Sequence, residues 1–190
     1  MAAETKFNNA TQAVGQLVEV TERPTTKVSF PADLPDSVIG YFTVGDIHAR
    51  LLRLYGGAPW QSYGSDSRTS RDQAIKENLR KIKSGQVVVI SAGYNDAIST
   101  NERPEAIGAR VADIVTTSVK LDHVISFLLF PITTKGSASR QQAVRAAIIS
   151  SLSRLNNIRL IDLNASKYSL EVDGVALTRE SYILISDGLI

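Results

Sequence analysis

The sequence predicts an α/β protein, a three-layer α/β/α sandwich built around a mostly parallel sheet. From Val38 onward, short apolar runs alternate with stretches of helical periodicity, which is typical of parallel βαβ units. The run at residues 86–92 contains VVVI, a composition expected of a strand that is covered on both faces. A chain of 190 residues, 43% of them apolar, is long enough for one sizeable core.

Residues 1–37 differ in character from the remainder. This segment is polar and rich in Thr and Asn, and Pro24, Pro31 and Pro35 interrupt any regular element. We therefore expect two parts, an extended N-terminal arm at 1–37 and a single domain at 38–190. An arm of this kind can order on the surface of a protein partner or of a second copy of the chain.

Within the domain, the expected elements follow one another as strand and helix. The strands are predicted at residues 38–44, 86–92, 123–131 and 158–163. The helices are predicted at residues 49–55, from the cap Ser70 to 83, at 104–119 and 139–155, and after the cap Thr178. Because ligands of open parallel sheets bind outside the carboxyl ends of the strands, the candidate loops follow Val44, follow Ala92 and surround Asp173.

Composition excludes several classes of function. The 21 basic and 19 acidic residues nearly cancel, which argues against nucleic-acid and membrane-surface partners. Cysteine is absent and only two histidines are present, so we expect no disulfide and no metal site. We expect no cofactor either. The N-terminus does not show the pattern of a secretory signal, and the apolar run at 124–132 is too short to span a bilayer. We expect a soluble protein, located in the cytoplasm or in an assembled particle such as a virion.

Four short motifs occupy the candidate loops in a characteristic order. The first expected strand ends in VGDIHA at residues 44–49, and the next in GYND at residues 93–96. Between them lies SYGSDS at residues 62–67, and near the C-terminus lies DGVALT at residues 173–178. In this order and at these strand ends, the motifs resemble the sequence blocks of the SGNH (GDSL-type) hydrolases. The resemblance covers residues 38–190 and implies a flavodoxin-like sheet.

The same resemblance assigns roles to individual residues. It implies that Gly64 and Asn95 donate to an oxyanion, and that Asp173 orients a catalytic imidazole. It also places five side chains around the pocket, and Trp60 and Tyr63 among them either stack on a flat ligand or simply pack. The five are Asp46, His48, Trp60, Tyr63 and Tyr94. A turn without catalytic meaning is the alternative interpretation of the segments at Asn95 and Asp173.

Two departures from the family pattern concern the reacting groups. The nucleophilic serine falls on Ile47 and the catalytic histidine falls on Ala176. Isoleucine has no nucleophilic atom and alanine has no base, so the ordinary acyl-transfer mechanism is not available. His48 is displaced by one residue around the turn, and His123 begins a strand rather than ending one, so neither is expected to replace the base.

These observations lead to two hypotheses from different classes. The first is a catalytically inactive SGNH hydrolase-like domain that serves as a binding or structural module, in an assembly such as a virus particle. The alternative is a weak or unorthodox esterase that acts on acyl groups of a lipid or carbohydrate. A pocket that binds a carbohydrate or acyl ligand without cleaving it is compatible with the first hypothesis.

Overall fold

A computed structural model describes residues 39–43, 61–62, 69–71, 87–119, 124–156 and 158–189. The described residues form a five-stranded parallel sheet in the order β2-β1-β3-β4-β5. The strands are β1 (Ile39–Thr43), β2 (Gln61–Ser62), β3 (Val87–Ser91), β4 (Val124–Leu129) and β5 (Ile158–Asp162). Numbered along the chain, this order is 2-1-3-4-5, which is the flavodoxin-like order, so the predicted sheet is confirmed.

The register of the sheet brings the carboxyl ends of its strands together. Thr43 at the end of β1 pairs with Ser91 at the end of β3. Ser91 pairs in turn with Leu128 of β4, and Leu128 pairs with Ile161 of β5. The last residues of β1, β3, β4 and β5 therefore lie at one common edge of the sheet, which is the carboxyl edge.

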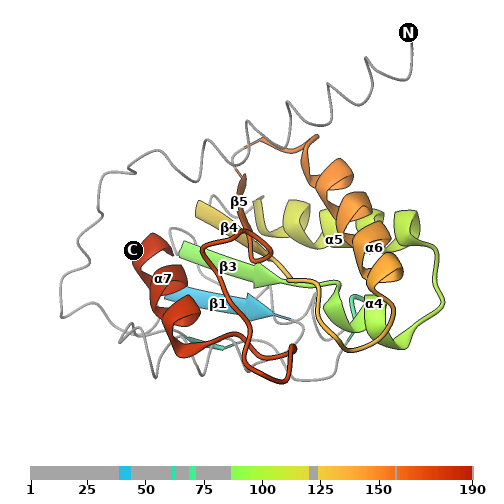
Figure 1. Cartoon of the computed structure of the whole chain (residues 1–190). Helices are drawn as coiled ribbons and strands as arrows, with labels where there is room; N and C mark the ends of the chain where they lie inside the picture. Colours follow the sequence, from blue (N-terminus) through green and yellow to red (C-terminus); the bar gives the residue numbers. More distant parts are fainter. Residues whose placement is uncertain are drawn as a thin grey trace, which may run out of the picture.

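Helices lie on both sides of this sheet. They are α4 (Tyr94–Ser99), α5 (Pro104–Val119), α6 (Ala138–Leu152) and α7 (Arg179–Leu189). In Figure 1, α5 and α6 lie together on one side of the sheet and α7 lies on the other. The arrangement is the three-layer sandwich that the alternating pattern predicts.

The core is built on the central strand and on the helix that follows it. Val88, Val89 and Ile90 are consecutive and have no exposed surface, so both faces of β3 are covered, as the VVVI run predicts. On α5, Ile107, Val111 and other residues of one helical face are buried against the sheet. Full burial of each such side chain contributes about 1.5–3 kcal/mol of transfer free energy.

The structure differs from the sequence-based expectation at three places. Residues 94–96, expected to be a loop, form the first turn of α4, because Gly93 takes a left-handed conformation (φ 99°) and its carbonyl accepts from the Ala97 amide. Helix α6 ends at Leu152 instead of residue 155. Strand β2 was not expected, since it has two polar residues and no apolar alternation.

Several expected elements lie outside the described residues. These are the arm at 1–37, the helix at 49–55 and most of the helix expected from Ser70 to residue 83.

Replacement of Gly93 by alanine should destabilise the domain by about 1–3 kcal/mol. A Cβ at Gly93 would lie 2.6 Å from Ile148 Cδ1, and the positive φ adds backbone strain. Urea unfolding of Gly93→Ala measures the loss. Gly188→Ala is the matched control, because the nearest atom to its new Cβ is Arg159 Nη2 at 3.8 Å and α7 accommodates alanine. Equal stability of the two variants would contradict this account of the β3–α4 junction.

Candidate functional site

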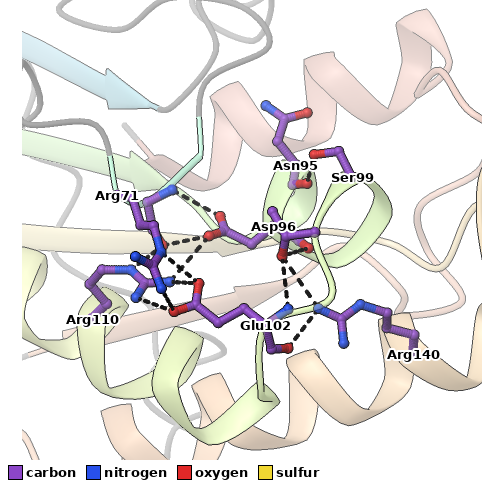
Figure 2. Close-up of polar contacts among 9 residues, drawn as sticks. Arg71, Asn95, Asp96, Ser99, Glu102, Arg110 and Arg140 are labelled. Carbon is purple, nitrogen blue, oxygen red and sulfur yellow. Dashed lines mark hydrogen bonds and ion pairs between the residues drawn. The ribbon is translucent and has the colours of Figure 1, made fainter.

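The segment after β3 places two of the predicted site residues at the carboxyl edge. Tyr94 and Asn95 open α4, and both are partly buried. The Tyr94 hydroxyl lies 2.9 Å from Thr133 Oγ1, and its ring centroid lies 5.6 Å from that of Phe130. The Asn95 side chain points away from the carboxylate of Asp96 (Figure 2). The side chains of Asn95 and Asp96 therefore face different parts of the structure although the two residues are neighbours in sequence.

The segment around Asp173 forms a tight turn. Asp173 Oδ1 accepts hydrogen bonds from the amides of Val175 at 2.8 Å and of Ala176 at 3.1 Å. These two bonds lower the pKa of the Asp173 carboxyl from its ordinary value, because they stabilise the charged form. Asp173 and Ala176 are both exposed. The turn that the sequence analysis gave as one interpretation of this segment is present, and the ionised carboxylate of Asp173 lies beside residue 176.

Helix α7 begins directly after this turn. Thr178 Oγ1 accepts a hydrogen bond from the Ser181 amide at 3.2 Å, which is the pattern of an N-cap. The predicted cap at Thr178 is confirmed.

Six residues that the motif resemblance assigned to the site lie outside the described residues. They are Asp46, Ile47, His48, Trp60, Tyr63 and Gly64. Their assignments stay predictions. The described part of β1 ends at Thr43, which pairs with Ser91 at the edge that carries Asn95.

The burial of the Asp96 carboxylate, which belongs to α4, is a feature that the sequence analysis missed. Asp96 is fully buried, and its Oδ2 and Oδ1 accept hydrogen bonds from the Ser70 amide at 2.9 Å and the Ser70 hydroxyl at 2.7 Å. Arg110 Nη2 lies 3.5 Å from Asp96 Oδ1, and Arg110 Nε donates to Ser70 Oγ at 2.9 Å. The Asp96 carboxylate thus ties the segment 69–71 to α4 and α5.

Glu102 extends this arrangement into a cluster of ion pairs, drawn in Figure 2. Its carboxylate accepts from Arg110, with Nη1 at 2.8 Å, and from Arg71, with Nε at 3.0 Å. These hydrogen bonds, from Arg110 first and Arg71 second, lower the pKa of Glu102 to about 2. The Glu102 carbonyl accepts from Arg140 Nη2 at 2.7 Å, which links the cluster to α6. We call Ser70, Arg71, Asp96, Glu102, Arg110 and Arg140 the Asp96 cluster.

The chemistry open to the Asp96 cluster is limited by its own pairing. The Glu102 carboxylate accepts from Arg110 and Arg71, and the Asp96 carboxylate accepts from Ser70, forms an ion pair with Arg110 and has no exposed surface. Neither carboxylate is therefore placed to exchange a proton with a ligand. Within the described residues, no group of three or more His, Asp or Glu side chains is arranged to hold a metal ion. Because its carboxylates are paired in this way, the Asp96 cluster is a structural support for the edge.

In the described part of the chain, no helix is both long and apolar enough to cross a membrane.

The replacement Asp96→Ala should lower the free energy of unfolding by about 3 kcal/mol. It leaves the buried Ser70 amide and hydroxyl without their acceptor and removes a charge that Arg110 faces. Urea unfolding at pH 7 measures the change. Glu105→Ala is the control, since Glu105 is exposed and lies 3.8 Å from an exposed Arg103, and it should cost less than about 1 kcal/mol. A small loss for Asp96→Ala would show that the buried carboxylate does not support the edge.

The lowered pKa of Glu102 predicts a pH dependence of stability. Its folded-state pKa of about 2 lies below the ordinary value of 4.5, so its contribution is present above pH 4.5 and is lost as the pH falls toward 2. Between pH 7 and pH 3, the urea midpoint of the unmodified chain should fall further than that of Glu102→Gln, which carries no such carboxyl. The exposed Glu105→Gln variant serves as control and should follow the unmodified chain. Parallel falls in all three proteins would contradict the pairing of Glu102.

Comparison with known proteins gives a match in structure but not in sequence. No model of a known protein family matches the chain, and no curated protein matches it either. Among solved structures, a GDSL-like lipase from Bacteroides thetaiotaomicron superposes with a TM-score of 0.64 at 14% identity, covering 95% of each chain. An acetyl xylan esterase superposes with a TM-score of 0.58 at 15% identity, covering 80% of this chain and 98% of the esterase.

A third structure has the same fold with a lower TM-score. The psychrotrophic esterase EstA from a Pseudoalteromonas species superposes with a TM-score of 0.52 at 14% identity, covering 79% of this chain and 93% of that one. At identities this low, the superpositions establish the fold and leave the chemistry open. The parallel 2-1-3-4-5 sheet and these superpositions agree with the motif order in the sequence. The chain therefore has the fold of the SGNH (GDSL-type) hydrolases.

Proposed function

We propose that this chain is a catalytically inactive SGNH-fold domain that acts as a binding or structural module. The observation that carries the proposal is the turn at 173–176. Asp173 directs one carboxylate oxygen at the amides of Val175 and Ala176, and the residue at the position of the base has only a methyl group.

The chemistry of the family explains why this substitution matters. A serine esterase needs a hydroxyl that attacks the ester carbonyl and an imidazole that removes the hydroxyl proton. The sequence offers Ile47 and Ala176 at these two positions, and neither side chain can take part. What remains in the described structure is Asn95 at the start of α4 and the ionised carboxylate of Asp173.

The binding role is supported by the parts of the chain that catalysis does not require. Residues 1–37 are the candidate docking arm toward a protein partner or a second copy, and an assembled particle such as a virion is a setting in which such a module would be used. The names of the structural relatives, a lipase and an acetyl xylan esterase, suggest acyl groups or acetylated carbohydrate as the ligand class. Both points belong to the proposal.

A weak esterase is the second candidate, and the retained Asn95 and Asp173 are the residues that favour it. Oxyanion donors and substrate binding without a nucleophile and base leave at most roughly 10³-fold acceleration over water. Such a residual activity would not require a serine at position 47, where this chain has isoleucine.

Restoring both missing groups provides the test. The double replacement Ile47→Ser with Ala176→His should hydrolyse p-nitrophenyl acetate at least about 10²-fold faster than the unmodified chain, because it supplies nucleophile and base together. Each single replacement should gain little, since the two groups act as a unit. Initial rates at pH 8 measure the effect, and circular dichroism verifies that each variant is folded.

Two further variants separate the candidate functions. Ser65→Ala and Ser67→Ala remove the hydroxyls that flank the expected oxyanion loop. If the unmodified chain hydrolyses the ester and keeps that activity in both variants, the inactive-domain proposal fails and another site must be sought. Absence of activity in the unmodified chain together with gain in the double variant supports the proposal.

A further inference from the structure

The loop after β4, residues 130–137, lies between the two described parts of the candidate site. On one side, Thr133 Oγ1 lies 2.9 Å from the hydroxyl of Tyr94, next to Asn95. On the other side, the Thr134 amide donates to the Gly174 carbonyl at 2.9 Å, and the Thr134 hydroxyl donates to the Asp173 carbonyl at 2.9 Å. Two consecutive threonines thus connect the helix of Asn95 to the turn of Asp173.

Steric fit at Gly174 shows how closely the turn approaches this loop. Gly174 has a φ of +67°, and a Cβ added to it would lie 2.5 Å from Thr134 Cγ2. The backbone of the turn therefore rests directly on the side chain of Thr134, and a larger residue at 174 would separate them.

The loop itself is anchored to α6. The fully buried Gln141 accepts from the Thr133 amide at 2.9 Å. Its amide nitrogen donates to the carbonyls of Thr133 at 3.0 Å and Lys135 at 2.9 Å. Because Thr134 lies between these two anchored residues, its position is fixed by a buried side chain.

The Asp173 turn has internal hydrogen bonds but is exposed. The Glu171 amide donates to the Ala176 carbonyl at 2.7 Å, and the Gly174 amide donates to the Glu171 carbonyl at 2.8 Å. These bonds set the shape of the turn. They do not fix where the turn lies relative to the sheet, whereas the two bonds from Thr134 do.

We propose that Thr134 is a positioning residue for the carboxylate of Asp173, holding the turn at 171–176 so that a side chain at position 176 meets this carboxylate at a fixed distance. The inference rests on the proposed function, since it takes position 176 as that of the lost base. In the present chain the Ala176 amide lies 3.1 Å from Asp173 Oδ1, which already places residue 176 beside the carboxylate.

An imidazole introduced by Ala176→His reports on this geometry without any need for esterase activity. Ala176 is exposed, so the larger side chain can be accommodated. We expect the pKa of the new imidazole, followed by NMR titration, to rise from the ordinary value of about 6.5 to about 7.5, because the carboxylate stabilises its charged form. Adding Asp173→Asn should return the pKa to about 6.5.

The role of Thr134 is then measured in the same Ala176→His background. Thr134→Val and Thr134→Ala should each remove about half of the rise, because the hydroxyl bond to the Asp173 carbonyl is lost while the amide bond to Gly174 is kept. Thr134→Ser keeps the hydroxyl and should retain the rise. Thr117→Val is the matched control, because the Thr117 hydroxyl donates to the Asp113 carbonyl within α5. Glu171→Gln is a second control, which removes another carboxylate of the turn. Neither should change the pKa as Thr134→Val does.

The outcomes separate the inference from the proposed function. A raised pKa that depends on Asp173 but is the same with threonine, valine or alanine at 134 overturns the positioning role and leaves the site assignment standing. A pKa that is ordinary in Ala176→His and unchanged by Asp173→Asn shows that residue 176 does not face the carboxylate, which overturns the site assignment itself. Loss of the rise in both Thr134→Val and Thr134→Ala, with recovery in Thr134→Ser, supports the positioning role.

Discussion

The carboxylate of Asp96 is the constraint on which this side of the domain depends. A charge with no exposed surface is tolerated only when donors surround it, and here the amide and hydroxyl of Ser70 supply them together with Arg110. Ser70 lies 26 positions earlier in the chain, so satisfying the charge fixes a long-range contact. Glu102 then joins Arg110 to Arg71, and its carbonyl receives Arg140 of α6. One buried charge therefore organises the segment 69–71, α4, α5 and α6.

A second group of polar contacts holds the loop after β4 on the same edge. Arg145 is almost fully buried, donates to the Phe130 carbonyl and pairs with both carboxylate oxygens of Asp162 at 2.7 and 2.9 Å. Together with Gln141, it fixes the loop from which Thr134 reaches the Asp173 turn. Ala176 makes no comparable contribution, because its side chain is exposed. The edge is thus supported by Arg145, Gln141 and Asp162, and the side chain at position 176 takes no part in this support.

What the sequence could predict follows from the range of each interaction. The VVVI strand, the apolar face of α5 and the Thr178 cap depend on near neighbours, and all three were predictable. The contacts of Ser70 with Asp96 and Arg110, and that of Thr134 with Asp173, join residues 26, 40 and 39 positions apart, and no local sequence pattern predicts such pairs. Helix α4 was missed because it has only six residues and begins after a left-handed glycine. The positions of Ile47 and Gly64 still rest on the resemblance of their motifs alone.

The two aspartates differ in what can explain their presence. Asp96 is accounted for by the fold, because each of its oxygens accepts from a Ser70 donor and the guanidinium of Arg110 lies 3.5 Å from Oδ1. Asp173 is not accounted for in the same way. It is exposed, and the bonds that it accepts from the amides of Val175 and Ala176 are those of a local turn that an uncharged asparagine can also form. The negative charge at 173 therefore has no structural necessity among the described residues. The charge of Asp173 is exposed at this edge, whereas that of Asp96 is buried among the donors that it satisfies.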